Sequence, residues 1–280
     1  MTNAIILADR GVVEVAGADA VKFLHGLLTN DVKSLKAGEA RFAALLSPQG
    51  KILVDFLVFA KEGEDGAVFL LDCPSALVAD LLRRLTMYKL RANISIVDRS
   101  AEFVSIAFPD AAEKPEFEAV ALAPDPRSPG LGWRGLATPA VAATIAAAAR
   151  EAYEARRIAA GVPDGGVDFV YGDAFPHEAN MDRLAGVDFK KGCFVGQEVV
   201  SRMKHRGTVR KRVTPFHAEG LAPAPGTPVT AGEVEIGVTG SRFGGEGLAL
   251  IRLDKLEDAK AGGATPLAGG VALQFTVAEE

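Results

Sequence analysis

The feature that most constrains the fold of this 280-residue chain is a short segment with two glycines, an isolated cysteine and an adjacent amide and carboxylate. It reads Phe189-Lys190-Lys191-Gly192-Cys193-Phe194-Val195-Gly196-Gln197-Glu198. Gly192 and Gly196 predict a tight loop, because glycine adopts positive φ angles and allows close backbone approach. Helical spacing from about Val195 to His205, followed by Gly207, predicts that the loop leads into a helix.

Cys193 is expected at this loop-to-helix junction, beside the ammonium groups of Lys190 and Lys191. A neighbouring positive charge lowers the pKa of a thiol. The attraction between a thiolate and a helix terminus is worth only about 0.3–1 kcal/mol. Lowering the pKa of the thiol by one unit takes about 1.36 kcal/mol, so a lysine would have to contribute as well. Taken alone, the cysteine is equally well explained as a half-buried structural residue.

The segment resembles the signature Lys-Gly-Cys-aromatic-x-Gly-Gln-Glu of the YgfZ-type folate-binding proteins, through Lys191, Gly192, Cys193, Phe194, Gly196, Gln197 and Glu198. Upstream, residues 175–182 resemble the family's Pro-x-Glu-x-Asn-hydrophobic-Asp motif. The resemblance implies a relative of the glycine-cleavage aminomethyltransferases (T-proteins) that assists iron–sulfur protein maturation and is connected with tRNA modification.

The resemblance also implies roles for individual residues. Lys191 would bind an anion or tune Cys193, which would be a redox-sensitive thiol or a single ligand in a shared site. Glu178 would point at a folate ring. Gln197 and Glu198 would fix the loop.

Length and composition describe an ordinary globular protein at the size where one core begins to divide. No segment approaches the ~18 uncharged apolar residues of a membrane helix, and the first ten residues lack the basic start of a signal peptide. Two cysteines, Cys73 and Cys193, form neither a disulfide framework nor a paired metal motif. We therefore expect a cytoplasmic protein that binds no membrane and has no metal site of its own.

The first part of the chain predicts alternating strands and helices. We expect strands over residues 11–15, 41–47, 52–60, 68–71, 94–97 and 103–108, and helices over residues 19–28 and 75–87. Between the second and third strands, residues 48–51 carry the turn formers of a hairpin. Residues 109–118 predict a surface connection.

Asp55 interrupts a hairpin strand that is otherwise apolar on both faces. An unpaired buried carboxylate costs several kcal/mol. Asp55 therefore either has an edge position or a cationic partner, or faces a ligand, and the two interpretations carry equal weight. In the resembling aminomethyltransferases this strand carries an Asp-Asp pair that contacts folate, whereas this chain has Val54-Asp55.

Residues 130–135 match a Gly-x-Gly-x-x-Gly pattern, but the next helix is expected only at Pro139. A pyrophosphate cradle needs the helix at the third glycine, so we expect no dinucleotide site. The aminomethyltransferases carry a Gly-Glu-Asp-Gly loop in this neighbourhood, and this chain lacks it. We expect Trp133 to be a packing residue, with a face for a pterin ring as the alternative.

Residues 139–160 predict one long alanine-rich helix, capped by Thr138 and closed by Gly161. Arg156 and Arg157 near its end suit either the negative helix terminus or a ligand.

An acid-free basic run follows the signature, over residues 202–212. It predicts either a solvated face or a site for the glutamate tail of a folate, a nucleic-acid phosphate or an acidic partner protein.

Short strands and Gly/Pro turns from Val213 onward predict a small antiparallel barrel. We therefore expect an α+β protein with an aminomethyltransferase-like folate-binding region of two similar α+β subdomains over residues 1–212, and a C-terminal antiparallel β-barrel over residues 213–280. The family resemblance implies that these units surround a central cavity.

The function expected from these observations is that of a folate-binding accessory protein for iron–sulfur cluster assembly or repair. Tetrahydrofolate or another folate would contact Asp55, Trp133, Glu178 and Lys191, and an iron–sulfur cluster would be held at most transiently. Partners would be iron–sulfur client or assembly proteins. The alternative is a folate-dependent aminomethyltransferase or methyltransferase of the T-protein type. A stable nucleic-acid complex is not expected, because the basic run lacks interleaved aromatic residues.

Overall fold

N-terminal strands that are largely apolar on both faces build a five-stranded antiparallel sheet. The computed structural model describes residues 4–63, 66–109, 111–145, 147–207 and 209–276. In spatial order the sheet consists of β3 (Ala40–Leu46), β4 (Ile52–Gly63), β5 (Gly66–Pro74), β2 (Arg10–Gly17) and β6 (Ser95–Asp98). One face packs against α1 (Ala20–Leu27) and α2 (Val78–Lys89), which follows the short 3-10 turn η1 (Ser75–Leu77).

A smaller four-stranded sheet covers the other face of the first one. Its spatial order is β1 (Ile5–Ile6), β7 (Val104–Phe108), β9 (Trp133–Ala137) and β8 (Ala121–Pro124), with the 3-10 turn η2 (Pro129–Leu131) before β9. The largest apolar cluster fills the space between the two sheets. The strands and helices expected up to residue 108 are therefore confirmed, with ends shifted by a few residues; Asp110, in the predicted connection, lies outside the described residues.

The single long helix predicted over residues 139–160 is wrong. The described part of this segment contains two shorter helices, α3 (Pro139–Ala142) and α4 (Arg150–Ala159). Ala146 lies outside the described residues.

Backbone contacts explain why the alanine-rich segment does not continue as a helix. The Thr144 hydroxyl donates to the main-chain oxygen of Val141 (2.7 Å), closing the turn after α3. The Ala148 N–H then donates to the main-chain oxygen of Ala4 (2.7 Å), beside β1. Tertiary pairing with the start of the chain therefore overrides the helical propensity of alanine.

The C-terminal part forms a closed six-stranded antiparallel barrel, as predicted. Around the barrel the order is β10 (Lys211–Ala218), β13 (Glu246–Arg252), β12 (Val234–Phe243), β11 (Pro228–Ala231), β14 (Pro266–Ala268) and β15 (Val271–Phe275). α6 (Leu253–Ala261) packs on its core. β10 straddles the domain boundary expected between residues 212 and 213.

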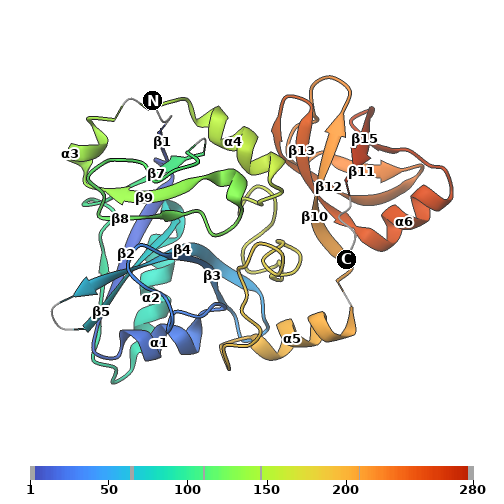
Figure 1. Ribbon diagram of the computed structural model, residues 1–280. Helices are drawn as coiled ribbons and strands as arrows, with labels where there is room; N and C mark the ends of the chain where they lie inside the picture. Colours follow the sequence, from blue (N-terminus) through green and yellow to red (C-terminus); the bar gives the residue numbers. More distant parts are fainter. Residues whose placement is uncertain (1–3, 64–65, 110, 146, 208, 277–280) are drawn as a thin grey trace.

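A long segment without strands or helices, residues 163–196, lies between the sheets and the barrel (Figure 1). It leads into α5 (Gln197–Arg206), which ends at Gly207 in the left-handed conformation. The predicted helix after the signature is thereby confirmed. Within the described ranges, no helix is long and apolar enough to span a bilayer.

Candidate functional site

The signature loop, residues 191–198, crosses the surface between α1 and the turn that joins β3 to β4. Gly196 forms the N-terminal cap of α5 with a φ of 80°. The Phe194 N–H donates to the side-chain oxygen of Gln197 (3.3 Å), so Gln197 closes the loop on itself. Glu198 is exposed and accepts from Arg202 (2.7 Å) one helical turn later.

Gly196 packs directly on the hairpin turn. A Cβ atom at this position would lie 2.6 Å from the Ser47 main-chain oxygen and 2.9 Å from Gly50 Cα. Only glycine permits such an approach together with a positive φ. The predicted hairpin turn and the signature loop therefore form one continuous surface feature.

The other side of the signature loop is held by the end of α1. Lys191 Nζ donates to the main-chain oxygen of His25, and the His25 ring Nε2 lies 3.0 Å from the main-chain oxygen of Lys191. Burial lowers the pKa of Lys191, although Asp31, Asp188 and Cys193 oppose this shift. The ammonium group is thus fixed at the end of α1, 5.0 Å from the centroid of the Phe194 ring.

The two cysteines occupy opposite environments. Cys193 is exposed, next to Gly192, whose φ of 102° turns the chain outward. It precedes the first residue of α5 by four positions, so the expected placement at the helix start is corrected: Gly196 holds that position. Cys73 is fully buried in β5, and burial raises the pKa of its thiol to about 12. Cys193 is therefore the thiol that a partner can reach.

Asp55 faces the interior between the two sheets. Its register opposite Ala44 places it on the same face of the five-stranded sheet as Asp72. The hydroxyl of Tyr171, from the 163–196 segment, donates to Asp55 Oδ1. Burial, together with the Asp55 charge, raises the pKa of Tyr171, so the phenol remains a neutral donor. Asp55 is thus a half-buried carboxylate with one oxygen engaged.

Glu178 and Trp133 lie in surroundings different from those of Asp55. Glu178 Oε2 accepts from the Phe175 N–H (2.8 Å) and closes a turn of its own segment. Trp133 packs into the apolar cluster on the outer face of the four-stranded sheet. Its neighbour Arg134 points to the inner face instead. No contact recorded among the described residues joins Glu178 or Trp133 to Asp55, and their folate roles stay predictions.

A buried ionic cluster around Asp72 is the main feature that sequence reasoning missed. The carboxylate of Asp72, fully buried, accepts from Arg10 Nε (2.8 Å), Arg134 Nε (3.0 Å) and the Ser105 hydroxyl (2.9 Å). Burial alone would raise the pKa of Asp72, but Arg10 and Arg134 lower it to about 2. Asp72 interrupts an apolar strand as Asp55 does, so the same signal was available.

The barrel is joined to the rest of the chain by a second buried network. Arg157 of α4 donates to Asp168 Oδ2 (3.1 Å) and to the Ser241 hydroxyl of β12 (2.7 Å). Asp168 also accepts from the Ser241 N–H (2.6 Å). Arg157 lies in the last turn of α4, as the helix-terminus interpretation requires, and its side chain also ties the barrel in place; a ligand role for the arginine pair stays a prediction.

The predicted basic patch over residues 202–212 is only partly at the surface. Arg212 is buried and donates to both carboxylate oxygens of Asp182 (2.9 and 3.0 Å). Lys204 lies over the Phe189 ring, 3.7 Å from its centroid. Thr208 lies outside the described residues. Among the residues that the structure describes, no group of three or more His, Cys, Asp or Glu side chains is placed to hold a metal ion.

Comparison with known protein families assigns both parts of the chain. Residues 7–113 match the family described as the GCVT N-terminal domain, and residues 210–279 match the CAF17 C-terminal beta-barrel domain. The chain of aminomethyltransferase T of the glycine cleavage system from Bartonella henselae superposes with a TM-score of 0.76 at 17% identity, covering 98% of this chain and 85% of that one. This likeness shows the fold and confirms the predicted fold class.

Curated relatives include the mitochondrial iron–sulfur cluster assembly factor IBA57 of Mus musculus, 33% identical over 279 residues, which cover 90% of this chain and 78% of the relative. An IBA57 homolog from Mycosarcoma maydis is 38% identical over 230 residues, 76% of this chain. The chain spans 57% of that relative's length. Because these relatives are named as mitochondrial proteins, the expected cytoplasmic location is corrected.

Proposed function

We propose that this chain, which belongs to the IBA57 family of iron–sulfur cluster assembly factors, acts as an accessory protein in iron–sulfur cluster assembly or repair. The observation that carries the proposal is the signature loop. It presents the exposed thiol of Cys193 on a rigid base, held by α1 on one side and by the β3–β4 turn on the other. The narrower assignment to the YgfZ-type proteins rests on the signature at residues 191–198 alone.

Cys193 supplies the chemistry in this proposal. Cysteine thiolates are the usual ligands of iron–sulfur clusters, and a cluster needs about four of them. One exposed cysteine therefore provides a single ligand, and a client or assembly protein provides the others. Lys191, in the same loop, carries the positive charge that would pair with an anionic group brought by the partner.

The experiment compares the two cysteines in cells depleted of their own factor of this family. Cys193→Ser should fail to restore [4Fe–4S] enzymes, including those of tRNA modification, whereas Cys73→Ser should restore them in proportion to its folded amount. Enzyme activities and the level of folded protein are measured together. Full restoration by Cys193→Ser would show that the loop acts through its shape and not through its sulfur.

We propose in addition that a folate binds at Asp55. The pterin ring presents adjacent N–H donors, and a carboxylate accepts such donors with its two oxygens. Asp55 fits this role, because it is half-buried and faces the interior, and because its Oδ2 accepts no hydrogen bond from the residues that the structure describes. Glu178 also engages one oxygen, but with the Phe175 N–H of its own turn, so that carboxylate has a local structural role. Asp55 has its hydrogen bond with a residue far away in the chain, and it therefore supports the folate hypothesis more directly than Glu178 does.

Calorimetry with tetrahydrofolate tests this second proposal. Asp55→Asn should weaken binding at least about tenfold, since a charge-assisted pair of hydrogen bonds is lost. Glu178→Gln is the matched control and should change affinity less than about threefold, because its partner is the protein's own backbone. Absence of saturable binding at millimolar folate would reject the proposal.

Aminomethyl transfer stays the alternative function, favoured by the structural likeness to aminomethyltransferase T. Fold alone does not carry an activity, and the acidic Gly-Glu-Asp-Gly loop is missing from this sequence. Transfer from an aminomethylated lipoyl carrier above the uncatalysed rate would establish that alternative.

A further inference from the structure

A groove of about 380 Å³ lies between the start of α1 and the end of α2, and we refer to it as the α1–α2 groove. Its apolar lining consists of Phe23 from α1 and of Tyr88 and Leu90 at the end of α2. Met87, Tyr88 and Leu90 are all exposed and belong to none of the apolar clusters in the described part of the chain. Large apolar side chains gathered at a surface are typical of an interaction site.

Leu90 occupies a backbone conformation that suits glycine. Its φ is 46° and its ψ is −109°, and the Ala92 N–H donates to the main-chain oxygen of Lys89 (2.9 Å) across it. These angles belong to the first central position of a type II′ turn, where a bulky residue is strained. The leucine side chain is 87% exposed, so packing within the described chain does not offset the strain. Local misfits of this kind are characteristic of functional sites.

The α1–α2 groove also has a positive rim. Lys22, Lys89 and Arg91 line it, and none of these three side chains has an ion pair or hydrogen bond with the described residues. Asp19 is the one acidic side chain among the lining residues, and its Oδ2 accepts from the Asn93 N–H (2.7 Å). Three unpaired cations against one carboxylate leave a local positive charge in a chain whose net charge is −5. The rim therefore favours an acidic occupant.

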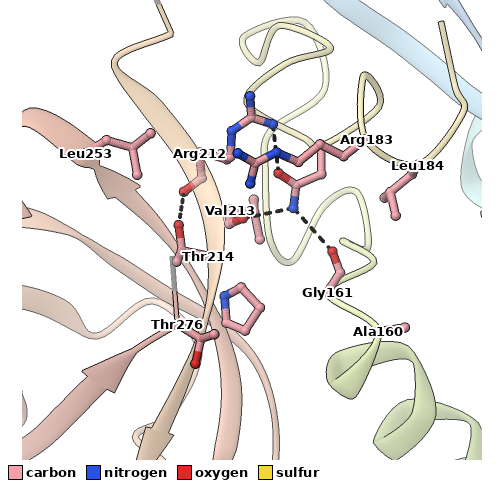
Figure 2. A pocket seen from close by; sticks show the side chains of 11 residues that line it. Ala160, Gly161, Arg183, Leu184, Arg212, Val213, Thr214, Leu253 and Thr276 are labelled. Atoms are coloured by element: carbon pink, nitrogen blue, oxygen red, sulfur yellow. Dashed lines mark hydrogen bonds between the residues drawn. The ribbon is translucent and has the colours of Figure 1, made fainter. Parts of the chain in front are cut away.

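The cavity between β10 and the end of α4 differs from this groove, because its main polar side chains already have partners within the chain (Figure 2). Asn180 donates to the main-chain oxygens of Gly161 (3.2 Å) and Val213 (2.9 Å). The terminal nitrogens of Arg212 pair with Asp182. The cations of the α1–α2 groove, in contrast, are available to a partner molecule.

The concave shape of the groove favours inserted side chains over a flat surface. A cavity of about 150 Å³ holds one benzene molecule. The α1–α2 groove, at about 380 Å³, therefore has room for about two large side chains. A lipid surface would meet the exposed leucine but would leave the groove between the two helices empty.

We propose that the α1–α2 groove docks a segment of a partner protein in which large apolar side chains are flanked by Asp or Glu. The apolar side chains enter the groove, and the carboxylates pair with the lysines and the arginine of the rim. The other end of α1 holds the signature loop through His25, so a docked partner lies one short helix away from the base of that loop. Neither Asp55 nor Cys193 lines the groove, so this docking role can fail without affecting the iron–sulfur proposal.

The probe is the peptide acetyl-Glu-Glu-Phe-Leu-Glu-Glu-amide, titrated into the full chain and followed by amide chemical shifts. We expect saturable shifts centred on residues 19–23 and 88–92. A peptide with Gln in place of each Glu should bind at least about fivefold more weakly, and so should one with Ser in place of Phe and Leu. Equal affinities for the three peptides, shifts centred elsewhere, or no saturable binding at millimolar peptide would overturn the proposal.

Leu90→Gly separates binding from folding. Glycine adopts a φ of 46° without strain, so this variant should have a urea midpoint at least as high as that of the unmodified chain. Its affinity for the acidic peptide should fall at least about fivefold. Leu221→Gly is the matched control, because Leu221 is also exposed, at 66%, and lies outside the groove; it should leave the affinity unchanged. A Leu90→Gly chain that is less stable and binds the peptide equally well would make Leu90 a structural residue and reject the site.

The same variant distinguishes two other occupants. Sedimentation with vesicles of phosphatidylcholine and phosphatidylglycerol tests a lipid surface, and analytical ultracentrifugation tests a second copy of the chain. We expect neither to depend on Leu90. Vesicle binding or self-association that is lost in Leu90→Gly, in a chain that does not bind the peptide, would overturn the proposal in favour of that occupant.

Discussion

The Asp72 cluster and the signature loop are held in place by different physical means. Around Asp72, two guanidinium groups and a hydroxyl satisfy one buried carboxylate. In the signature loop, main-chain oxygens and a glycine contact fix the backbone, and the thiol stays exposed. The first region depends on charge balance and the second on backbone shape.

This difference separates stability from function. The Asp72 cluster lies between the two sheets and links β2, β5, β7 and β9. Its loss affects the whole chain, because buried charges without partners are costly. The signature loop can lose its sulfur without losing any of the contacts that hold it. Substitution of Asp72 should therefore lower the stability of the whole chain. Substitution of Cys193 should lower activity and leave stability unchanged.

Asp72→Asn should produce the largest effect. It leaves Arg10 and Arg134 buried without their common counter-charge, and we expect a loss of about 3–5 kcal/mol in the free energy of unfolding. Urea denaturation measures it. Asp80→Asn, which breaks half-exposed pairs with Arg83 and Arg84 at the start of α2, is the control and should cost less than about 1 kcal/mol.

The same residue gives a test with acid. The folded-state pKa of Asp72 is about 2, below the ordinary value of 3.8. Its contribution to stability is therefore complete above about pH 4 and is lost as the pH falls toward 2. Asp72→Asn should flatten this part of the stability curve. A loss below about 1 kcal/mol and an unchanged acid limb would mean that the cluster does not act as a unit.

Substitution of the two glycines of the signature loop should have the second largest effect on stability. Both have positive φ, 102° for Gly192 and 80° for Gly196, but only Gly196 contacts the hairpin turn. We expect Gly192→Ala to cost about 1–2 kcal/mol from backbone strain alone. Gly196→Ala should cost at least about 1 kcal/mol more, because its Cβ meets the Ser47 oxygen.

Urea denaturation and the alkylation rate of Cys193 are measured for both variants. Gly196→Ala should also change the alkylation rate, since it displaces the loop from its base. Equal costs for the two substitutions would show that the contact with the hairpin turn does not hold the loop.

Much of the fold could be predicted from the sequence because its signals are local. Two apolar runs on either side of the turn formers at residues 48–51 predicted the β3–β4 hairpin, which the structure contains. The cost of a buried charge predicted an edge position or a cationic partner for Asp55, or else a ligand. The structure gives Asp55 a hydrogen bond from Tyr171, and its charge also raises the pKa of Arg10; the ligand stays a prediction. The same reasoning applied to Asp72 would have predicted the ionic cluster.

The remaining features depend on pairing between distant parts of the chain. Arg212 was counted with the surface patch, yet Asp182 and Asn180 draw it into the interior. The break in the helix predicted over residues 139–160 depends on a bond from Ala148 to Ala4. Neither pairing leaves a periodic signal, so neither could be read from spacing or composition.

A substitution of His177, in the segment that leads to the signature loop, should produce the smallest effect. Its ring is buried, and neither ring nitrogen has a hydrogen-bond partner among the described residues. The ring centroid lies 6.0 Å from that of Phe189, which leads into the signature loop. Burial lowers the pKa of His177 below 6.5; Asp182 opposes this shift, while Arg212 and Lys204 add to it.

The sign of the resulting pH dependence follows from proton binding. Below pH 6.5 the unfolded chain takes up a proton at His177 that the folded chain resists, so stability falls as the pH drops through 6.5 toward the folded-state pKa. His177→Phe should remove this slope between pH 7.5 and 5.5, as measured by urea midpoints. His177→Asn is the control, because it keeps a polar group without a titrating one: it should remove the same slope and should be less stable than His177→Phe at both pH values. A slope that survives in both variants would assign the acid sensitivity to other groups and leave His177 as a packing residue beside the loop.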